Sequence, residues 1–107
     1  MVNSKRKGTK FEYDCKKWLK QRIPVAEIFR SPASLGSADL LCIYKGYGFP
    51  VVQMYQCKYL KKYMTRKERE RIIDDAKRLC AEAFLLYREK PRGKIMSEAL
   101  WINGGLP

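Results

Sequence analysis

The chain has 107 residues, of which 23 are Lys or Arg and 11 are Asp or Glu, so its formal charge is +12. This length predicts one domain with a single core, and the charge predicts a polyanionic partner such as a nucleic acid. Histidine is absent, which excludes Ser-His-Asp catalysis, Cys-His catalysis and histidine-bound zinc. Any catalysis must therefore use carboxylates, lysine, hydroxyl groups and a metal ion.

The cysteines, at positions 15, 42, 57 and 80, form no C-x-x-C pair, which disfavours a zinc ribbon. The sequence shows no signal peptide and no apolar run near the length of a membrane span. We therefore expect a cytoplasmic protein with reduced cysteines and no association with membranes.

The first predicted element is a helix from about Thr9, or somewhat earlier, to Arg22, with Pro24 just after its end. On a helical wheel, Glu12 falls inside the edge of the apolar arc, which comprises Phe11, Cys15, Trp18, Leu19 and Arg22. Two explanations are open. Thr9 and Glu12 match a capping box, in which Glu12 satisfies a backbone amide, or Glu12 is a functional acid directed toward the core side. Because the residues described below complete a possible site, we favour the functional acid.

The rest of the chain alternates between strand and helix signals. Strands are predicted over residues 25–30, 38–44, 51–59, 84–87 and 95–102. A small, polar and flexible loop is expected over 31–37, and turns over 45–50 and 89–94. Thr65 and Glu68 match the capping box of a second helix, whose apolar stripe comprises Ile72, Ala76, Leu79, Cys80 and Ala83. The predicted order is α-β-β-β-α-β-β, an α/β fold with a mixed sheet flanked by helices.

The second and third strands form a predicted hairpin whose register follows from its turn. If Tyr44 pairs with Val51, then Asp39 pairs with Gln56, because paired positions sum to a constant. Side chains alternate between the faces of a strand, so Asp39, Gln56 and Lys58 share one face. Near the turn, the same face is apolar and carries Leu41, Ile43, Val52 and Met54.

This polar group at the end of the hairpin is typical of a metal-dependent nuclease site. Hard cations such as magnesium need oxygen ligands, and a nearby ammonium group can hold or deprotonate a water molecule. The competing explanation is an ordinary ion pair between Asp39 and Lys58 at the end of the strands.

Further motifs extend the pattern along nearly the whole chain. Arg6-Lys7-Gly8 precedes the helix with Glu12, Arg30-Ser31 ends the first strand, a serine-rich loop leads to Ala38-Asp39-Leu40, and Gln56-Cys57-Lys58 ends the third strand. In this order, and with this charge, the chain resembles the archaeal-type Holliday junction resolvases of the PD-(D/E)XK nuclease superfamily. The resemblance implies a restriction-endonuclease-like fold in one nuclease domain over residues 1–107.

The resemblance also implies a role for each site residue. Asp39 and Gln56 would bind Mg²⁺, which Mn²⁺ could replace, and Glu12 would support the metal directly or through water. Lys58 would orient or activate the attacking water. The catalytic set would thus be Glu12, Asp39, Gln56 and Lys58. Contacts to the scissile phosphate would come from Arg30, Ser31 and Ser34, and contacts to backbone phosphates from Arg6 and Lys7. Members of this family are homodimers that cut opposed strands of a four-way junction.

One departure from the family pattern concerns position 56, where glutamine replaces the usual glutamate. An amide oxygen can still bind magnesium, but it brings no charge, so the affinity for the metal should be lower. We favour a structure-selective endonuclease acting on four-way junctions. The same site chemistry also serves repair, nicking and restriction nucleases. A catalytically inactive DNA-binding protein is a further alternative.

A third hypothesis is a stacking platform for single strands, built from aromatic residues. Its members would be Tyr44, Tyr47, Phe49, Tyr55, Tyr59 and Tyr63. We give more weight to positions in the core or in a dimer interface for these residues.

Overall fold

The computed structural model describes residues 4–31, 36–46, 48–60 and 63–102. Its helices and strands follow in the predicted order, α-β-β-β-α-β-β. They are α1 (Ser4–Arg22), β1 (Glu27–Arg30), β2 (Leu40–Lys45), β3 (Pro50–Tyr59), α2 (Arg66–Arg78), β4 (Glu82–Arg88) and β5 (Met96–Trp101).

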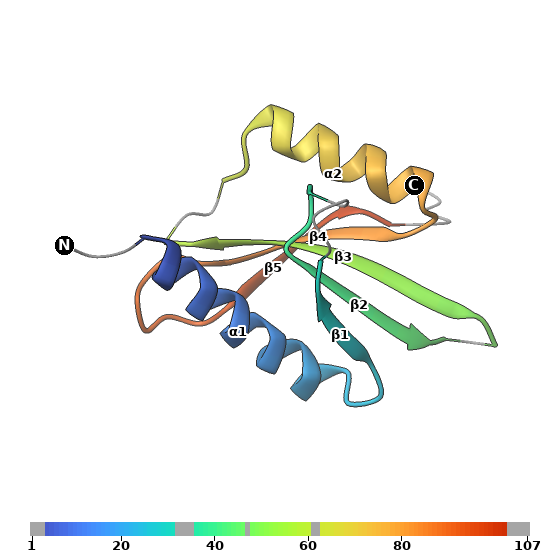
Figure 1. Ribbon diagram of the computed structural model, residues 1–107, viewed down its shortest axis with the longest axis horizontal. Helices are drawn as coiled ribbons and strands as arrows, with labels where there is room; N and C mark the ends of the chain where they lie inside the picture. The colour runs from blue at the N-terminus through green and yellow to red at the C-terminus, as the bar shows by residue number, and fades with distance from the viewer. Residues whose placement is uncertain (1–3, 32–35, 47, 61–62, 103–107) are drawn as a thin grey trace.

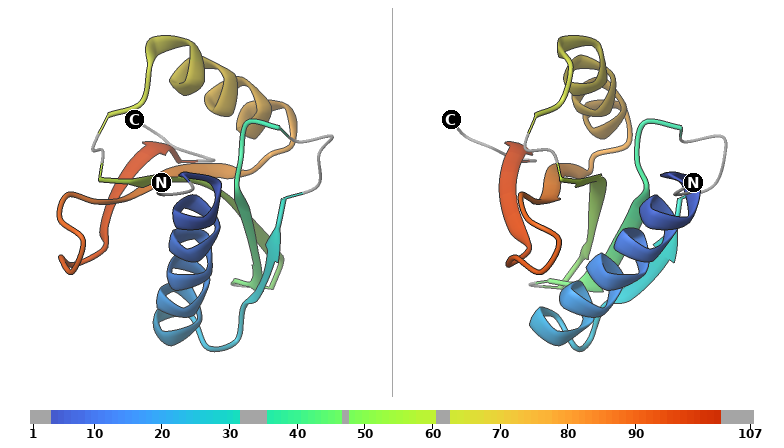
Figure 2. Two further views of the ribbon diagram at one scale, coloured as in Figure 1. Left: turned by 60° about the vertical axis from the view of Figure 1, so that its left-hand side comes forward. Right: turned by 90° about the vertical axis from the view of Figure 1, so that its left-hand side faces the viewer.

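The strands form one five-stranded mixed sheet in the order β1-β2-β3-β4-β5. Neighbouring strands are antiparallel except for β3 and β4, which are parallel because α2 crosses over between them. The two helices lie on opposite sides of this sheet, as Figures 1 and 2 show. Within the described residues, neither helix has the length and apolar character needed to cross a bilayer.

The core has two parts, one between the sheet and each helix. On the α1 side, Phe11, Cys15 and Leu19 pack with Leu40 and Tyr55, among others. On the α2 side, the packed residues are Ala38, Met54, Ile72, Ala76, Ala81 and Ala83. Successive strand residues face opposite sides of the sheet, which is why the neighbours Met54 and Tyr55 belong to different parts. All four cysteines are free, and Cys15 and Cys42 are buried as small hydrophobic residues.

The hairpin of β2 and β3 has the predicted register. Tyr44 pairs with Val51 and the ladder ends at the pair of Leu40 and Tyr55. Asp39 lies directly beyond this last pair, and its backbone amide donates a 2.8 Å hydrogen bond to the carbonyl of Tyr55. The ladder therefore fixes the backbone of Asp39 beside the end of β3.

The first helix begins before Thr9 and ends at Arg22, within the predicted bounds, whereas the second ends before the predicted end of its apolar stripe. Because α1 begins at Ser4, Thr9 lies inside the helix and cannot be its N-cap. The capping explanation for Glu12 is therefore wrong. The second helix ends at Arg78. Two residues later, at Cys80, the backbone adopts the left-handed conformation, with φ of 54°. Leu79 and Cys80 are consequently exposed instead of continuing the apolar stripe, and Ala83 belongs to β4.

The aromatic residues do not form a common stacking surface within the described part of the chain. Tyr55 is buried and stacks on Phe84 with ring centroids 5.1 Å apart, and Tyr59 packs on Phe11 at 5.5 Å. Tyr44 also packs against the core, whereas Phe49 and Tyr63 are exposed. Tyr47 lies outside the described residues.

Candidate active site

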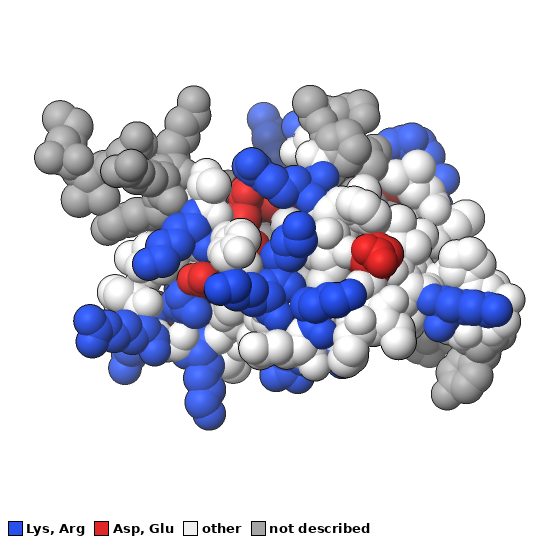
Figure 3. Space-filling view, turned by 60° about the horizontal axis from the view of Figure 1, so that its bottom comes forward, with Lys and Arg blue, Asp and Glu red and all other residues white. Residues whose placement is uncertain are grey.

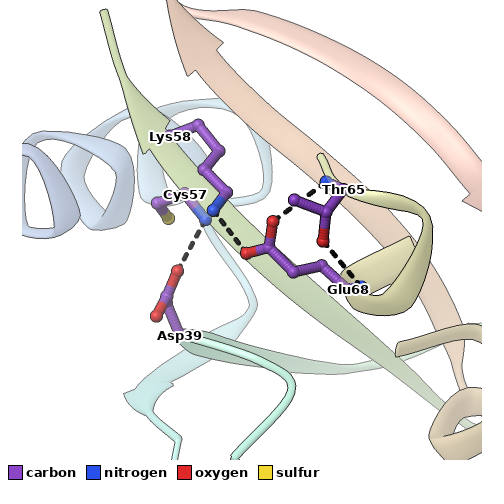
Figure 4. Close-up of polar contacts among 5 residues, drawn as sticks. All are labelled: Asp39, Cys57, Lys58, Thr65 and Glu68. Atoms are coloured by element: carbon purple, nitrogen blue, oxygen red, sulfur yellow. Dashed lines mark hydrogen bonds and ion pairs between the residues drawn. The ribbon is translucent and has the colours of Figure 1, made fainter. Parts of the chain in front are cut away.

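Asp39 is fixed beside the end of β3 by a hydrogen bond to its side chain. Its Oδ2 accepts a 2.7 Å hydrogen bond from the backbone amide of Cys57 (Figure 4). Cys57 lies between Gln56 and Lys58, so this bond places the carboxylate beside the Gln-x-Lys segment. The predicted proximity of Asp39 to that segment is therefore present in the structure.

Lys58 forms its ion pair with an acid that the sequence analysis did not assign to the site. Its ammonium group donates to Oε2 of Glu68, with Nζ and Oε2 2.5 Å apart. The alternative of an Asp39–Lys58 ion pair is thus wrong. Glu68 also completes the predicted capping box of α2 with Thr65. The capping motif explained Glu68 by itself, and no local signal in the sequence linked it to Lys58.

Gln56 is half-buried in β3, opposite Leu85 of β4. By the alternation of side chains along a strand, it shares its face with Met54 and Lys58. This is the face that packs against α2, because Met54 belongs to the core beneath that helix.

Glu12 approaches the site from the other helix. Its Oε2 lies 3.2 Å from Nη2 of Arg30, at the end of β1, so the two residues form an ion pair between α1 and the sheet. The Glu12 side chain is 22% exposed and that of Arg30 is 69% exposed. A cavity of about 160 Å³ adjoins the pair and is lined by Thr9, Glu12, Tyr13, Lys16, Arg30 and Leu40.

The two carboxylates influence each other electrostatically. Burial raises the pKa of Glu12, the negative charge of Asp39 raises it further, and Arg30 opposes both effects. Burial likewise raises the pKa of Asp39, while the Cys57 amide and the charge of Lys58 act in the opposite direction. The pKa of Glu68 is lowered, first by its hydrogen bond from Lys58. Two partly desolvated carboxylates that repel one another would be stabilised by a bound cation.

The donors near Asp39 are compatible with a hydrated magnesium ion. Among the described residues, no three Asp, Glu, Cys or His side chains come close enough together to hold a metal. Magnesium, however, is usually bound through one or two carboxylates and keeps several waters. The carboxylates of Asp39 and Glu12, with the amide of Gln56, meet that requirement in residue type.

Two of the predicted phosphate-binding residues, Arg30 and Ser31, lie beside the candidate site residues. Ser31 follows Arg30 directly, and its backbone amide donates a 2.9 Å hydrogen bond to the carbonyl of Asp39. Arg6 and Lys7 lie at the start of α1, and Ser34 lies outside the described residues.

The predicted flexible loop is anchored at its end. Ser37 is buried, and its hydroxyl donates a hydrogen bond to Asp75 of α2.

Basic side chains cover the surface around α1. Figure 3 shows lysine and arginine side chains spread over this side of the molecule. Among the residues of α1 whose side chains are described, the exposed basic ones are Lys10, Lys16, Lys17, Lys20 and Arg22. Such a surface attracts the phosphate backbone of a nucleic acid irrespective of sequence.

Comparison with known proteins gives a structural relationship only. No family model and no curated protein matches the sequence. Among solved structures, the chain is similar to Hjc, a Holliday junction resolvase from the archaeal hyperthermophile Archaeoglobus fulgidus. The two share 22% identity and superimpose with a TM-score of 0.66, over 88% of this chain and 73% of the other. The chain therefore has the fold of an archaeal Holliday junction resolvase, as its sequence motifs predicted.

Proposed function

We propose that this protein is a magnesium-dependent endonuclease that cuts four-way DNA junctions. A fold alone does not establish an activity, so the proposal depends on the site residues. The observation that carries it is the hydrogen bond between the Cys57 amide and Asp39. This bond brings a carboxylate beside Gln56 and Lys58 within a fold shared with a known resolvase.

Asp39, Glu12 and Gln56 would hold the magnesium ion. When bound, the ion would stabilise the negative charge that develops on the phosphate during hydrolysis. Because Gln56 contributes no charge, we expect weak binding in which water fills several ligand positions. Manganese should substitute for magnesium in such a site.

The protein's own cations would act on the phosphate and on the water. The ammonium of Lys58 would orient the attacking water and offset the charge of the phosphorane. The exposed guanidinium of Arg30, with Ser31 beside it and Ser34 in the following loop, would contact the scissile phosphate. The lysines on α1, together with Arg6 and Lys7, would bind phosphates along the arms of the junction.

Resolution of a junction needs two cuts in opposed strands. Two copies of this chain related by a two-fold axis would present two equivalent sites, which is the simplest arrangement for paired cuts. We therefore propose that the protein acts as a homodimer.

A non-catalytic DNA-binding protein is the second candidate, and Gln56 is the observation that favours it. A neutral residue at that position leaves fewer charged ligands for a metal than a carboxylate would. The two candidates differ in their need for metal, because binding by basic residues survives chelation, whereas hydrolysis at this site does not.

The deciding experiment uses a labelled four-way junction and a linear duplex of matched sequence, each with magnesium or with a chelator. We expect symmetric cuts near the branch point of the junction, only with magnesium, and no cuts in the duplex. Binding without cleavage under all metal conditions would favour the second candidate. Equal cleavage of junction and duplex would support a nuclease but would contradict selectivity for four-way junctions.

A further inference from the structure

The carboxylate of Glu68 uses its two oxygens for two different partners. Its Oε1 accepts a 3.0 Å hydrogen bond from the backbone amide of Thr65, and its Oε2 accepts the 2.5 Å hydrogen bond from Lys58. The backbone of Glu68 is also held, because its amide donates a 3.1 Å hydrogen bond to the Thr65 hydroxyl. Figure 4 shows Glu68 between Thr65 and Lys58.

Capping of α2 does not by itself require a charge at position 68. Glutamine serves in a capping box as well as glutamate does, because the box needs only an acceptor for the N-cap amide. The contact with Lys58 does depend on charge. It is made by Oε2, the carboxylate oxygen that takes no part in capping. The contact therefore calls for an explanation beyond the stability of the helix.

Asp39 is a second acid whose charge interacts with that of Lys58. Lysine is long and has several rotatable bonds. A released Lys58 would turn toward Asp39 and neutralise the carboxylate assigned to the metal. Glu68 holds the ammonium on the α2 side and so keeps the lysine and the metal ligand apart.

We propose that Glu68 is a positioning residue, which fixes the ammonium of Lys58 for the nuclease reaction and prevents it from pairing with Asp39. The inference rests on the proposed function and extends it to a residue on α2.

The test compares Glu68→Gln with Glu70→Gln. Glu70 is on the same helix and forms a 3.0 Å ion pair with Arg66 in solvent, so it controls for the loss of one carboxylate from α2. We expect Glu68→Gln to lower the rate of junction cleavage about 10- to 100-fold, which is typical when a partner that orients a site residue is lost. It should also raise the magnesium concentration that gives half of the maximal rate. Both effects should be absent in Glu70→Gln.

Thr65→Ala separates positioning from capping. This variant loses the hydroxyl that caps α2 but keeps the Thr65 backbone amide and the Glu68 carboxylate. We expect a lower melting temperature with a normal cleavage rate at temperatures at which the variant is folded. If Thr65→Ala and Glu68→Gln lost activity to the same extent, Glu68 would act through the helix and the proposal would be wrong.

A second measurement does not depend on nuclease activity. The ammonium group of Lys58, held by Glu68, should give a protected ¹H–¹⁵N NMR signal in the wild type and in Glu70→Gln, and no such signal in Glu68→Gln. A signal that persisted in Glu68→Gln would overturn the positioning role. If the wild type showed the signal but cut no DNA, the ion pair between Lys58 and Glu68 would be confirmed and the proposed nuclease function would be rejected.

Discussion

Asp39 and Cys57 are joined by a 2.7 Å hydrogen bond between the Asp39 carboxylate and the Cys57 backbone amide. Because the donor is the backbone, the bond depends on the register of the hairpin and not on the cysteine side chain. It fixes the carboxylate beside Cys57, the residue between Gln56 and Lys58 in the sequence, and it leaves one oxygen of the carboxylate outside this bond. The site therefore depends on the pairing of β2 with β3.

Asp39→Asn should abolish cleavage, and added magnesium or manganese should rescue it poorly. The substitution removes the negative charge next to the Gln-x-Lys segment while the amide oxygen can still accept from Cys57. With Gln56 already neutral, the metal would depend on Glu12 alone. Cleavage of the labelled junction across a metal titration measures the effect. Near-normal cleavage by the folded variant would remove Asp39 from the site.

The same variant should be more stable than the wild type at neutral pH. The folded-state pKa of Asp39 is raised above its ordinary value of 3.8, so the folded protein binds this proton more tightly than the unfolded chain does. Stability from this group is present below that value and is lost as the pH rises through the folded-state pKa. The gain in melting temperature for Asp39→Asn should therefore be present at pH 7 and vanish below about pH 4. A lower melting temperature at pH 7 would contradict the raised pKa.

Gln56→Glu should lower the magnesium concentration needed for cleavage. It places a carboxylate at the position where the nuclease pattern that the sequence resembles has glutamate, so the site should attract the cation more strongly. Isothermal titration with magnesium measures the affinity directly in both proteins. Equal affinities would show that the side chain at position 56 does not touch the metal.

Lys58→Ala should abolish cleavage and leave junction binding nearly unchanged. One lysine among 23 basic residues adds little to the total attraction for phosphates, whereas loss of a cation at the reacting phosphate should lower the rate by orders of magnitude. Lys67→Ala, which removes an exposed lysine of α2, is the matched control. A folded Lys58→Ala protein that cuts at the control rate would exclude a catalytic role.

Glu12→Gln should sharply reduce cleavage while the melting temperature stays the same or rises slightly. Glu12 lies inside α1 rather than at its start, so its carboxylate caps nothing. Its pKa is raised by burial and by Asp39, so removal of the charge relieves repulsion in the folded state at neutral pH. Asp14→Asn is the control, because Asp14 is an acid of the same helix that pairs with Arg88 at 3.4 Å. Normal cleavage with a clear loss of stability would return Glu12 to a structural role.

The sequence by itself determined the order of the elements and the register of the central hairpin. Both follow from local patterns, since periodicity identifies an element and a short turn sets the pairing of the strands it joins. The placement of Asp39 beside Gln56 and Lys58 was predictable for the same reason. The capping box of Thr65 and Glu68 was also readable, because its two residues are close in sequence.

Only the tertiary structure decided which charges meet across elements. The pairs Lys58–Glu68 and Glu12–Arg30 each join two elements whose separation in space depends on how the helices pack on the sheet. Local patterns contain no information on that packing, so Glu68 was predicted only as a cap, and an ion pair between Lys58 and Asp39 stayed open as the alternative to a catalytic lysine. The start of α1 at Ser4 likewise excluded a cap at Glu12 that the local motif allowed. Motifs of a few residues therefore predicted the candidate site, and long-range packing determined the ion pairs of its residues.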